Sequence, residues 1–307
     1  MIGLLLWWFS WAFAQNCEST NHQFRDFKSI VQTQMYSQQV AEKLTAAGWT
    51  CDSRTQEVRG TRCRGAIPGY PQKVNIYIPR SLQQAALSVN LHFHGYNLDR
   101  PQDIQRHFNM KNGDGDYGAF LARSQASSLL VIPESTGNGK DYSSFLGSAK
   151  QVNEFLAKIA KVSGTENQKW SMSGHSGAGK VINQILSDRR SLRPGLNSIA
   201  LFDALYGPHE NIQKWVRENR AAKKKFILFD SYISGLYPDG KALANDTWSK
   251  EYKRILGGKT ITVNQEISED VTYLDLYKER HLDVMSRHMA IMKNGRMDAF
   301  LRAAGAL

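Results

Sequence analysis

One short segment of the sequence has the residue types of a nucleophilic active site. Residues 170–180 read WSMSGHSGAGK, so Ser176 lies between Gly174 and Ala178, after an apolar run and before a helical pattern. A serine at a sharp strand-to-helix turn is held in a strained conformation and needs small residues two positions away on each side. The N–H of Gly177 would then face a developing oxyanion. We therefore expect Ser176 to be a nucleophile.

The same letters also contain the spacing of a phosphate-binding loop. Gly174 and the pair Gly179-Lys180 fit the pattern G-x-x-x-x-G-K. That motif continues with a Ser or Thr that ligates Mg²⁺, whereas Val181 stands at this position. The sequence therefore argues against a nucleotide hydrolase.

The elements that would position Ser176 alternate along the chain. Short apolar runs rich in β-branched residues, which are typical of buried parallel strands, occupy 74–78, 88–93, 128–132, 169–172, 199–202, 226–229 and 260–265. Amphipathic segments at 149–162 and 180–187 predict helices between them. This alternation predicts an α/β fold with a mostly parallel sheet and helices on both faces.

A small helical segment and a disulfide are expected before the main sheet. Residues 33–47 have helical spacing, and Gly48 follows them as a terminating glycine would. Cys51 and Cys63 flank a turn-like stretch, so an oxidising compartment would let them pair and clip a hairpin-like loop. Cys17 is then left over, and the three cysteines lack the spacing of a metal site.

The first fourteen residues indicate the compartment. Residues 1–14 read MIGLLLWWFSWAFA, an apolar run that ends in the small-x-small pattern preferred by signal peptidase. The run is too short to cross a hydrocarbon core of roughly 30 Å, and no later segment is long and apolar enough to span a membrane. We expect a secreted or periplasmic protein with a signal peptide at 1–14, an extension at 15–69 and one catalytic domain at 70–307.

Composition excludes some classes of protein. The 307 residues are 41% hydrophobic and 22% charged, which argues against a disordered or fibrous chain. Lys and Arg number 39 against 28 Asp and Glu, and the formal charge of +11 favours anionic partners such as a cell-wall polymer. The run Lys223 to Lys225 precedes a predicted strand and fits a solvated helix end better than a nucleic-acid contact. No nucleic-acid partner is expected.

The motif and the strand–helix alternation together resemble the α/β-hydrolases of the serine esterase or lipase type. The resemblance covers roughly residues 70–307, and GHSGA is a G-x-S-x-A variant of the family's G-x-S-x-G. It implies the chain order serine, acid, histidine. Asp203 and Asp230 each end a predicted strand, and we favour Asp203 with Asp230 as the alternate. His288 is favoured as the base over His281, and both follow the last predicted strand.

The resemblance also implies a second oxyanion donor in a loop after an earlier strand. Residues 90–97 read NLHFHGYN and fit that place. Gly95 would let the backbone approach the substrate oxygen, and the N–H of Gly95 or Tyr96 would join that of Gly177.

Two histidines in this segment have a second interpretation. His92 and His94 share one face of a strand, as a pair of metal ligands does. Only Asp99 and Asp103 are close to them in the sequence. We therefore expect the histidines to support the loop, and we expect no metal and no cofactor.

The constellation predicts hydrolysis of a carboxylic ester through an acyl-serine intermediate. The substrate would be a small-molecule ester or a polymer-linked one, such as an acyl group on a glycan or a cell-wall polymer. Tyrosines near predicted strand ends are available to stack on sugars, namely Tyr96, Tyr206, Tyr232 and Tyr237. Two alternatives stay open: a serine peptidase or amidase on the same fold, and a non-catalytic binding protein on a hydrolase scaffold.

Overall fold

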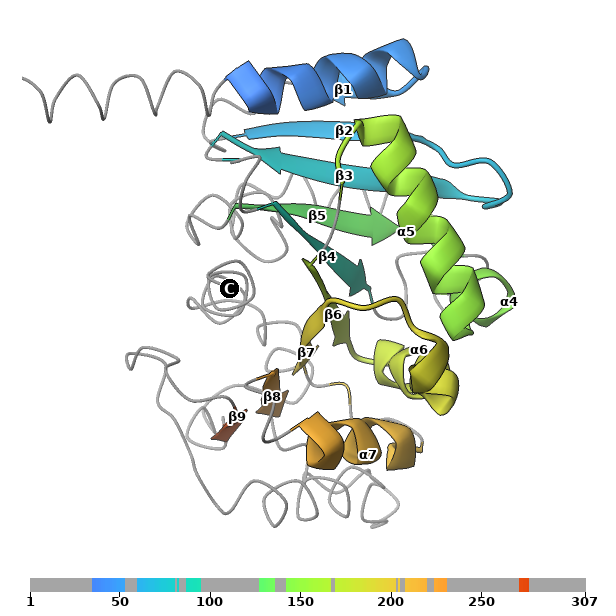
Figure 1. Cartoon of the computed structure of the whole chain (residues 1–307), viewed down its shortest axis with the longest axis vertical. Coiled ribbons are helices and arrows are strands. Elements are labelled where there is room, and N and C mark those ends of the chain that lie inside the picture. The colour runs from blue at the N-terminus through green and yellow to red at the C-terminus, as the bar shows by residue number, and fades with distance from the viewer. Residues whose placement is uncertain are drawn as a thin grey trace, which may run out of the picture.

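The computed structural model describes the central part of the chain and short segments beyond it (Figure 1). The described residues are 35–52, 60–80, 82, 87–94, 127–135, 142–166, 169–202, 204, 208–219, 224–230 and 271–275. They contain one nine-stranded sheet, formed by β1 (Thr50–Asp52), β2 (Gly60–Ala66), β3 (Lys73–Pro79), β4 (Ser88–Phe93), β5 (Ser128–Pro133), β6 (Lys169–His175), β7 (Leu196–Phe202), β8 (Lys225–Asp230) and β9 (Val271–Asp275).

The order of the strands identifies the fold. The sheet runs β1-β2-β3-β5-β4-β6-β7-β8-β9. β1 pairs antiparallel with β2, β3 is antiparallel to both β2 and β5, and the pairs from β5 to β9 are all parallel. From β2 onward this is the eight-stranded α/β-hydrolase arrangement, in which only the second strand is reversed. The predicted fold class is confirmed.

The described helices pack against one face of this sheet. They comprise residues 35–46, α4 (Ser143–Leu146), α5 (Ala149–Ser163), α6 (Ala178–Ile185), the 3-10 helix η2 (Leu186–Ser191) and α7 (Glu210–Asn219). Figure 1 shows α5, α6 and α7 along one side of the strands. Their apolar residues join alternate residues of β3 to β8 in a single buried cluster, since successive strand residues point to opposite faces. The predicted second helical layer falls outside the described residues.

Local signals set the limits of the helices. The hydroxyl of Ser148 accepts a hydrogen bond from the N–H of Gln151 at the start of α5, and Gly164 ends that helix with a left-handed φ of 65°. Residues 35–46 end before Gly48, which has a φ of 83°. The predicted helices at 33–47 and 149–162 are therefore present, with ends that a capping serine and two glycines define, and the third predicted helix, at 180–187, overlaps α6.

The strand predictions agree with the structure except at the end of the chain. The run 88–93 coincides with β4, and the runs at 74–78, 128–132, 169–172, 199–202 and 226–229 lie inside β3, β5, β6, β7 and β8. The predicted strand at 260–265 lies outside the described residues. The sequence analysis did not predict β9, whose residues are Val271–Asp275.

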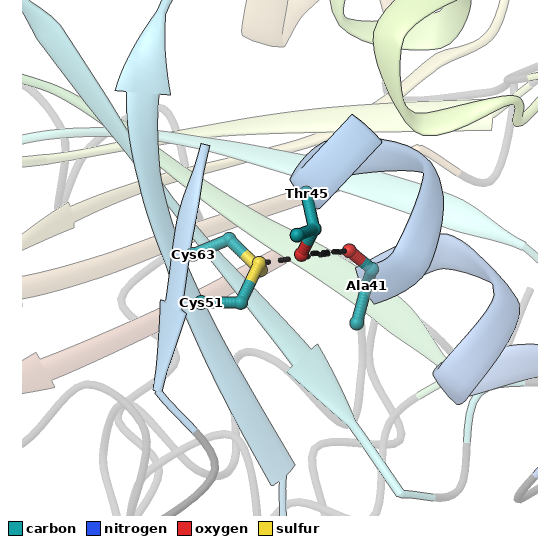
Figure 2. The surroundings of a disulfide bond; sticks show 4 residues. All are labelled: Ala41, Thr45, Cys51 and Cys63. Carbon is teal, nitrogen blue, oxygen red and sulfur yellow. Dashed lines mark hydrogen bonds between the residues drawn. A yellow bond between two sulfur atoms is a disulfide. The ribbon is translucent and has the colours of Figure 1, made fainter. Parts of the chain in front are cut away.

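The predicted disulfide joins the two strands at the edge of the sheet. Cys51 of β1 lies directly opposite Cys63 of β2, with Cα atoms 4.0 Å apart, and the two are bonded. The sulfur of Cys51 lies 3.6 Å from the carbonyl oxygen of Ala41, which also accepts a hydrogen bond from the Thr45 hydroxyl (Figure 2). The pairing of Cys51 with Cys63 is confirmed, and it joins β1 covalently to β2 next to the helix at residues 35–46.

The N-terminal predictions fall on other residues. The proposed signal peptide at 1–14 and the unpaired Cys17 lie outside the described part of the chain. Within that part, no helix has the length and apolar character needed to cross a membrane.

The second face of the sheet carries polar side chains where apolar ones are usual. Asn90 and His92 of β4, Ser171 and Ser173 of β6, and Ser198 of β7 are all buried. They alternate with the apolar residues that face the helices. We call these five residues the polar stripe. It runs across the middle of the sheet towards the edge at which Ser176 lies.

Candidate active site

Ser176 occupies the turn between β6 and α6. Its φ of 55° makes it the only non-glycine residue with a positive φ in the described part of the chain. This left-handed conformation is costly for a residue with a Cβ atom, so the surrounding structure must hold it. The N–H of Ser176 donates to the carbonyl of Phe202 at the end of β7, 3.1 Å away, and its own carbonyl accepts from Gly179 at 3.3 Å. The turn is thus fixed from both sides.

The small residues around Ser176 are a steric requirement. A Cβ atom on Gly174 would lie 2.9 Å from Cδ1 of Ile182 and 3.1 Å from Cβ of Ala178. Both distances are shorter than those that ordinary Cβ contacts show. The turn brings the end of β6 against the first turn of α6, which explains the spacing of Gly174 and Ala178 about the serine.

The first turn of α6 also packs against the loop that follows β7. A Cβ atom on Gly179 would overlap the carbonyl oxygen of Ala204. The same carbonyl accepts a hydrogen bond from His209, a buried residue just before α7. Burial lowers the pKa of His209 to about 4, although the bond to Ala204 opposes this shift. The neutral imidazole of His209 thus fixes the backbone at Ala204, the residue that follows the candidate acid Asp203 in the sequence.

The carboxyl end of β4 is fixed by Tyr142. Its hydroxyl accepts a hydrogen bond from the backbone N–H of His94 at 3.3 Å and donates to the carbonyl of Pro133 at 3.1 Å. The His94 ring in turn accepts the N–H of Ser135 at its Nε2 atom, 3.4 Å away. These bonds join the ends of β4 and β5 and hold the residue that precedes Gly95.

A partly buried ion pair holds the end of β5. Arg64 donates to both carboxylate oxygens of Glu134, at 2.6 and 2.9 Å, and Asn75 donates to the same carboxylate at 3.0 Å. The Tyr70 hydroxyl donates to the Glu134 carbonyl at 2.6 Å, and burial, with a smaller contribution from this carboxylate, raises the pKa of Tyr70. The Glu134 carboxylate is therefore engaged by Arg64 and Asn75. Glu134 directly precedes Ser135, whose N–H donates to the His94 ring.

The pair His92 and His94 is engaged in hydrogen bonds to protein groups. His92 is fully buried and contacts the Ser173 hydroxyl through Nδ1 at 2.8 Å. Burial, together with the nearby His175 and His94, lowers the pKa of His92 far below its ordinary value. Among the residues that the structure describes, no three His, Cys, Asp or Glu side chains are grouped so that they could hold a metal ion.

The remaining predicted site residues are only partly described. Gly177 precedes α6 and is the capping residue of that helix. The backbone of Asp230 ends β8, but its side chain lies outside the described part. The other predicted members of the site, which also lie outside it, are Gly95, Tyr96, Asp203, His281 and His288. The described residues provide no hydrogen-bond partner for the Ser176 hydroxyl.

The sheet register nevertheless relates the strand ends to one another. His175 pairs with Phe202 across β6 and β7, and Phe202 pairs with Phe229 across β7 and β8. Ser176 follows β6 directly and Asp230 is the last residue of β8, so both mark the same edge of the sheet, at which β7 ends with Phe202. Ligands of open α/β folds bind at this edge.

Sequence analysis did not identify two residues that fix the backbone beside the strand ends at this site. Tyr142 and His209 carry no local signal, because their partners are distant in the chain. The polar stripe did leave a signal, since the buried runs 88–94 and 169–175 have polar residues at every second position.

Comparison with known proteins gives a general likeness to hydrolases. An S-formylglutathione hydrolase from Agrobacterium tumefaciens has 11% sequence identity over 81% of this chain and 96% of that one, with a TM-score of 0.48. A thermostable esterase from Pseudomonas putida has 14% identity over 85% and 86%, with a TM-score of 0.44. An esterase of the bacterial hormone-sensitive lipase family has 12% identity over 90% and 98%, with a TM-score of 0.43.

No protein-family model and no curated protein matches the sequence. Identities this low carry no information about a substrate. The assignment of the fold therefore depends on the strand order and strand directions described above.

Proposed function

We propose that this protein is a serine hydrolase that cleaves a carboxylic ester through an acyl-serine intermediate. The observation that carries the proposal is the left-handed conformation of Ser176 at the carboxyl end of a central parallel strand. Such a conformation costs about 1–3 kcal/mol and is concentrated at functional sites. It presents the serine where a helix begins and where α/β folds bind their ligands.

The proposed reaction uses the serine hydroxyl as the nucleophile. Ser176 Oγ attacks the ester carbonyl carbon while an imidazole accepts its proton. The N–H of Gly177 and that of Gly95 or Tyr96 bind the oxygen that becomes negative. The imidazolium then protonates the leaving alcohol, which leaves an acyl-serine, and water repeats the sequence to release the acid and regenerate the serine.

We assign the imidazole to His288, with His281 as the alternate, and the acid to Asp203, with Asp230 as the alternate. The position of Asp203 in the chain supports this preference. The residue before it, Phe202, accepts the N–H of Ser176, so the chain leaves β7 directly beside the serine turn. β8, which ends at Asp230, lies one strand farther away.

The substrate is proposed to be a small-molecule or polymer-linked ester, including an acyl group on a glycan or an anionic cell-wall polymer. The excess of 39 Lys and Arg over 28 Asp and Glu supports an anionic partner. A serine peptidase or amidase would use the same groups, because the fold alone does not select the leaving group.

We also propose that the protein is secreted or periplasmic, with residues 1–14 removed, 15–69 as an extension and 70–307 as the catalytic domain. The Cys51–Cys63 disulfide supports an oxidising compartment. Under this proposal the exported protein begins at Gln15, and sequencing its N-terminus tests the cleavage.

Labelling with a fluorophosphonate tests the serine directly. Wild-type protein is expected to form a covalent adduct, and Ser176→Ala is expected to form none. Ser198→Ala is the matched control, because Ser198 is a buried serine inside the neighbouring strand β7. The control should label like the wild type.

The outcomes separate the two classes of function. A folded wild type that resists the probe, and that hydrolyses neither p-nitrophenyl acetate nor a peptide, would support a binding protein and exclude the serine hydrolase. If the wild type is labelled, a panel of acyl esters, acetylated glycans and peptides separates an esterase from a peptidase.

A further inference from the structure

Four buried polar side chains form a continuous chain of hydrogen bonds between β4 and β6. His92 Nδ1 lies 2.8 Å from Ser173 Oγ, and the Ser173 hydroxyl donates to Asn90 Oδ1 at 2.9 Å. Asn90 Nδ2 in turn donates to Ser171 Oγ at 2.7 Å. The four residues alternate between the two strands, and we call them the β4–β6 ladder.

The orientation of the Asn90 amide sets the direction of the bonds in the ladder. In the orientation that the structure has, its Oδ1 atom accepts the Ser173 proton and its Nδ2 atom donates to Ser171. The ring nitrogen Nδ1 of His92 must therefore carry a proton and donate it to Ser173. Burial keeps this imidazole neutral because it lowers the pKa of His92. The ladder thus needs the proton on Nδ1, which a neutral imidazole carries in one of its two tautomers.

The ladder fits only one register of the two strands. Asn90 pairs with Ser171 and His92 pairs with Ser173 in the parallel ladder of the backbone. A shift of one residue would bring side chains of opposite faces together and would leave these polar groups without partners. Each buried polar group without a partner costs about 1–3 kcal/mol. The side chains therefore reinforce the register that the backbone bonds already set.

Both strands end close to the groups of the proposed reaction. β6 ends at His175, and Ser176 and Gly177 follow directly. β4 ends at Phe93, two residues before Gly95. The two donors proposed for the oxyanion thus come from the ends of these adjacent strands, and their separation depends on how β4 lies along β6.

We propose that Asn90, His92 and Ser173 are positioning residues that set the separation between the Ser176 turn and the carboxyl end of β4. This inference depends on the proposed function. Geometry of this kind matters for the rate, because a displacement of about 1 Å at a reacting group costs on the order of 100-fold. A ladder of buried bonds limits such displacement.

The central test compares two buried serines of the polar stripe. Ser173→Ala removes the hydroxyl that joins His92 to Asn90, whereas Ser198→Ala removes a buried hydroxyl that has no hydrogen-bond partner among the described residues. With p-nitrophenyl acetate, Ser173→Ala is expected to lower kcat by about 10-fold to 100-fold, while KM changes less than about threefold. Ser198→Ala should keep kcat within about twofold of the wild type.

Variants of His92 provide an independent test with a rescue. His92→Asn places an amide N–H near the site of Nδ1, so it retains a donor for Ser173, whereas His92→Leu retains none. His92→Asn should recover a large part of the kcat that His92→Leu loses. If both variants lose the same share of kcat, the donor has no positioning role and the inference fails.

A purely structural role predicts a different pattern. The quadruple variant Asn90→Leu/Ser171→Ala/His92→Leu/Ser173→Ala removes all four members of the ladder together, and such replacement of paired groups is close to neutral for stability. Positioning predicts that this variant unfolds at a urea concentration nearer to the wild type than Ser173→Ala does, and yet keeps the low kcat. A recovery of kcat together with stability would overturn the proposal.

The failure of this inference differs from the failure of the proposed function. If the wild type neither reacts with the fluorophosphonate nor hydrolyses p-nitrophenyl acetate, the proposed function is wrong and the ladder has no catalytic role. If the wild type is active and folded Ser173→Ala matches Ser198→Ala in kcat, the function stands and the positioning role is excluded.

Discussion

Gly174 and Ile182 approach so closely that a Cβ atom on the glycine would lie 2.9 Å from Cδ1 of the isoleucine. Gly174 lies in β6, two residues before Ser176, and Ile182 lies in α6, six residues after it. The strained serine therefore depends on an apolar contact between its two flanking elements. A methyl group added at position 174 would need the space that Cδ1 of Ile182 occupies, so paired substitutions at the two positions test the contact.

Gly174→Ala is expected to lower the free energy of unfolding by about 1–3 kcal/mol, since an added methyl overfills a packed contact. Ile182→Val removes Cδ1 and should cost about 1 kcal/mol alone. In the double variant the new methyl occupies part of the vacated space, so the loss should be smaller than the sum of the two. Urea unfolding measures all three. As a control, Gly174→Ala with Ile185→Val should be additive, and an additive Ile182 pair would contradict the contact.

Stability is expected to fall as the solution becomes acidic. The pKa of His209 is lowered by burial from 6.5 to about 4, so between these values the unfolded chain binds a proton that the folded protein does not. The free energy of unfolding should decrease as pH falls from about 6.5 to 4, by at most about 3 kcal/mol, and His209 should contribute no change above this range. The lowered pKa of His92 acts in the same direction.

Urea unfolding at a series of pH values measures this dependence. His209→Gln should show a smaller decrease between pH 6.5 and 4 than the wild type, because the group that resists protonation is gone. Equal slopes for the two proteins would show that His209 is not the group responsible.

Removal of the disulfide is expected to destabilise the fold. Cys51 and Cys63 are separated by 12 residues, and closing a loop of that length is worth about 3 kcal/mol in the chain-entropy model. Reduction of the wild type, or the double variant Cys51→Ala/Cys63→Ala, should lower the free energy of unfolding by about this amount. A reductant should leave the double variant unchanged. An equal effect on both proteins would indicate that the reductant acts elsewhere.

Short segments of the sequence are enough to predict the local parts of the site. The turn at Ser176 needs small residues at fixed positions, and those positions can be read within the segment from Gly174 to Ala178. The limits of β4 followed from one apolar run, and the Cys51–Cys63 bond followed from a short turn-like loop. Each signal lies within about a dozen residues, where backbone sterics and periodicity act directly.

The contacts between distant segments depend on the three-dimensional packing of the chain. The sequence of β4 does not state that its neighbours are β5 and β6, and the bond between His92 and Ser173 joins residues 81 positions apart. The hydrogen bonds between His209 and Ala204 and between Tyr142 and His94 likewise form only when the strand ends meet. The conformation of a segment can be encoded in the residues of that segment alone. Contacts between strands, in contrast, depend on the packing of the whole sheet against its helices.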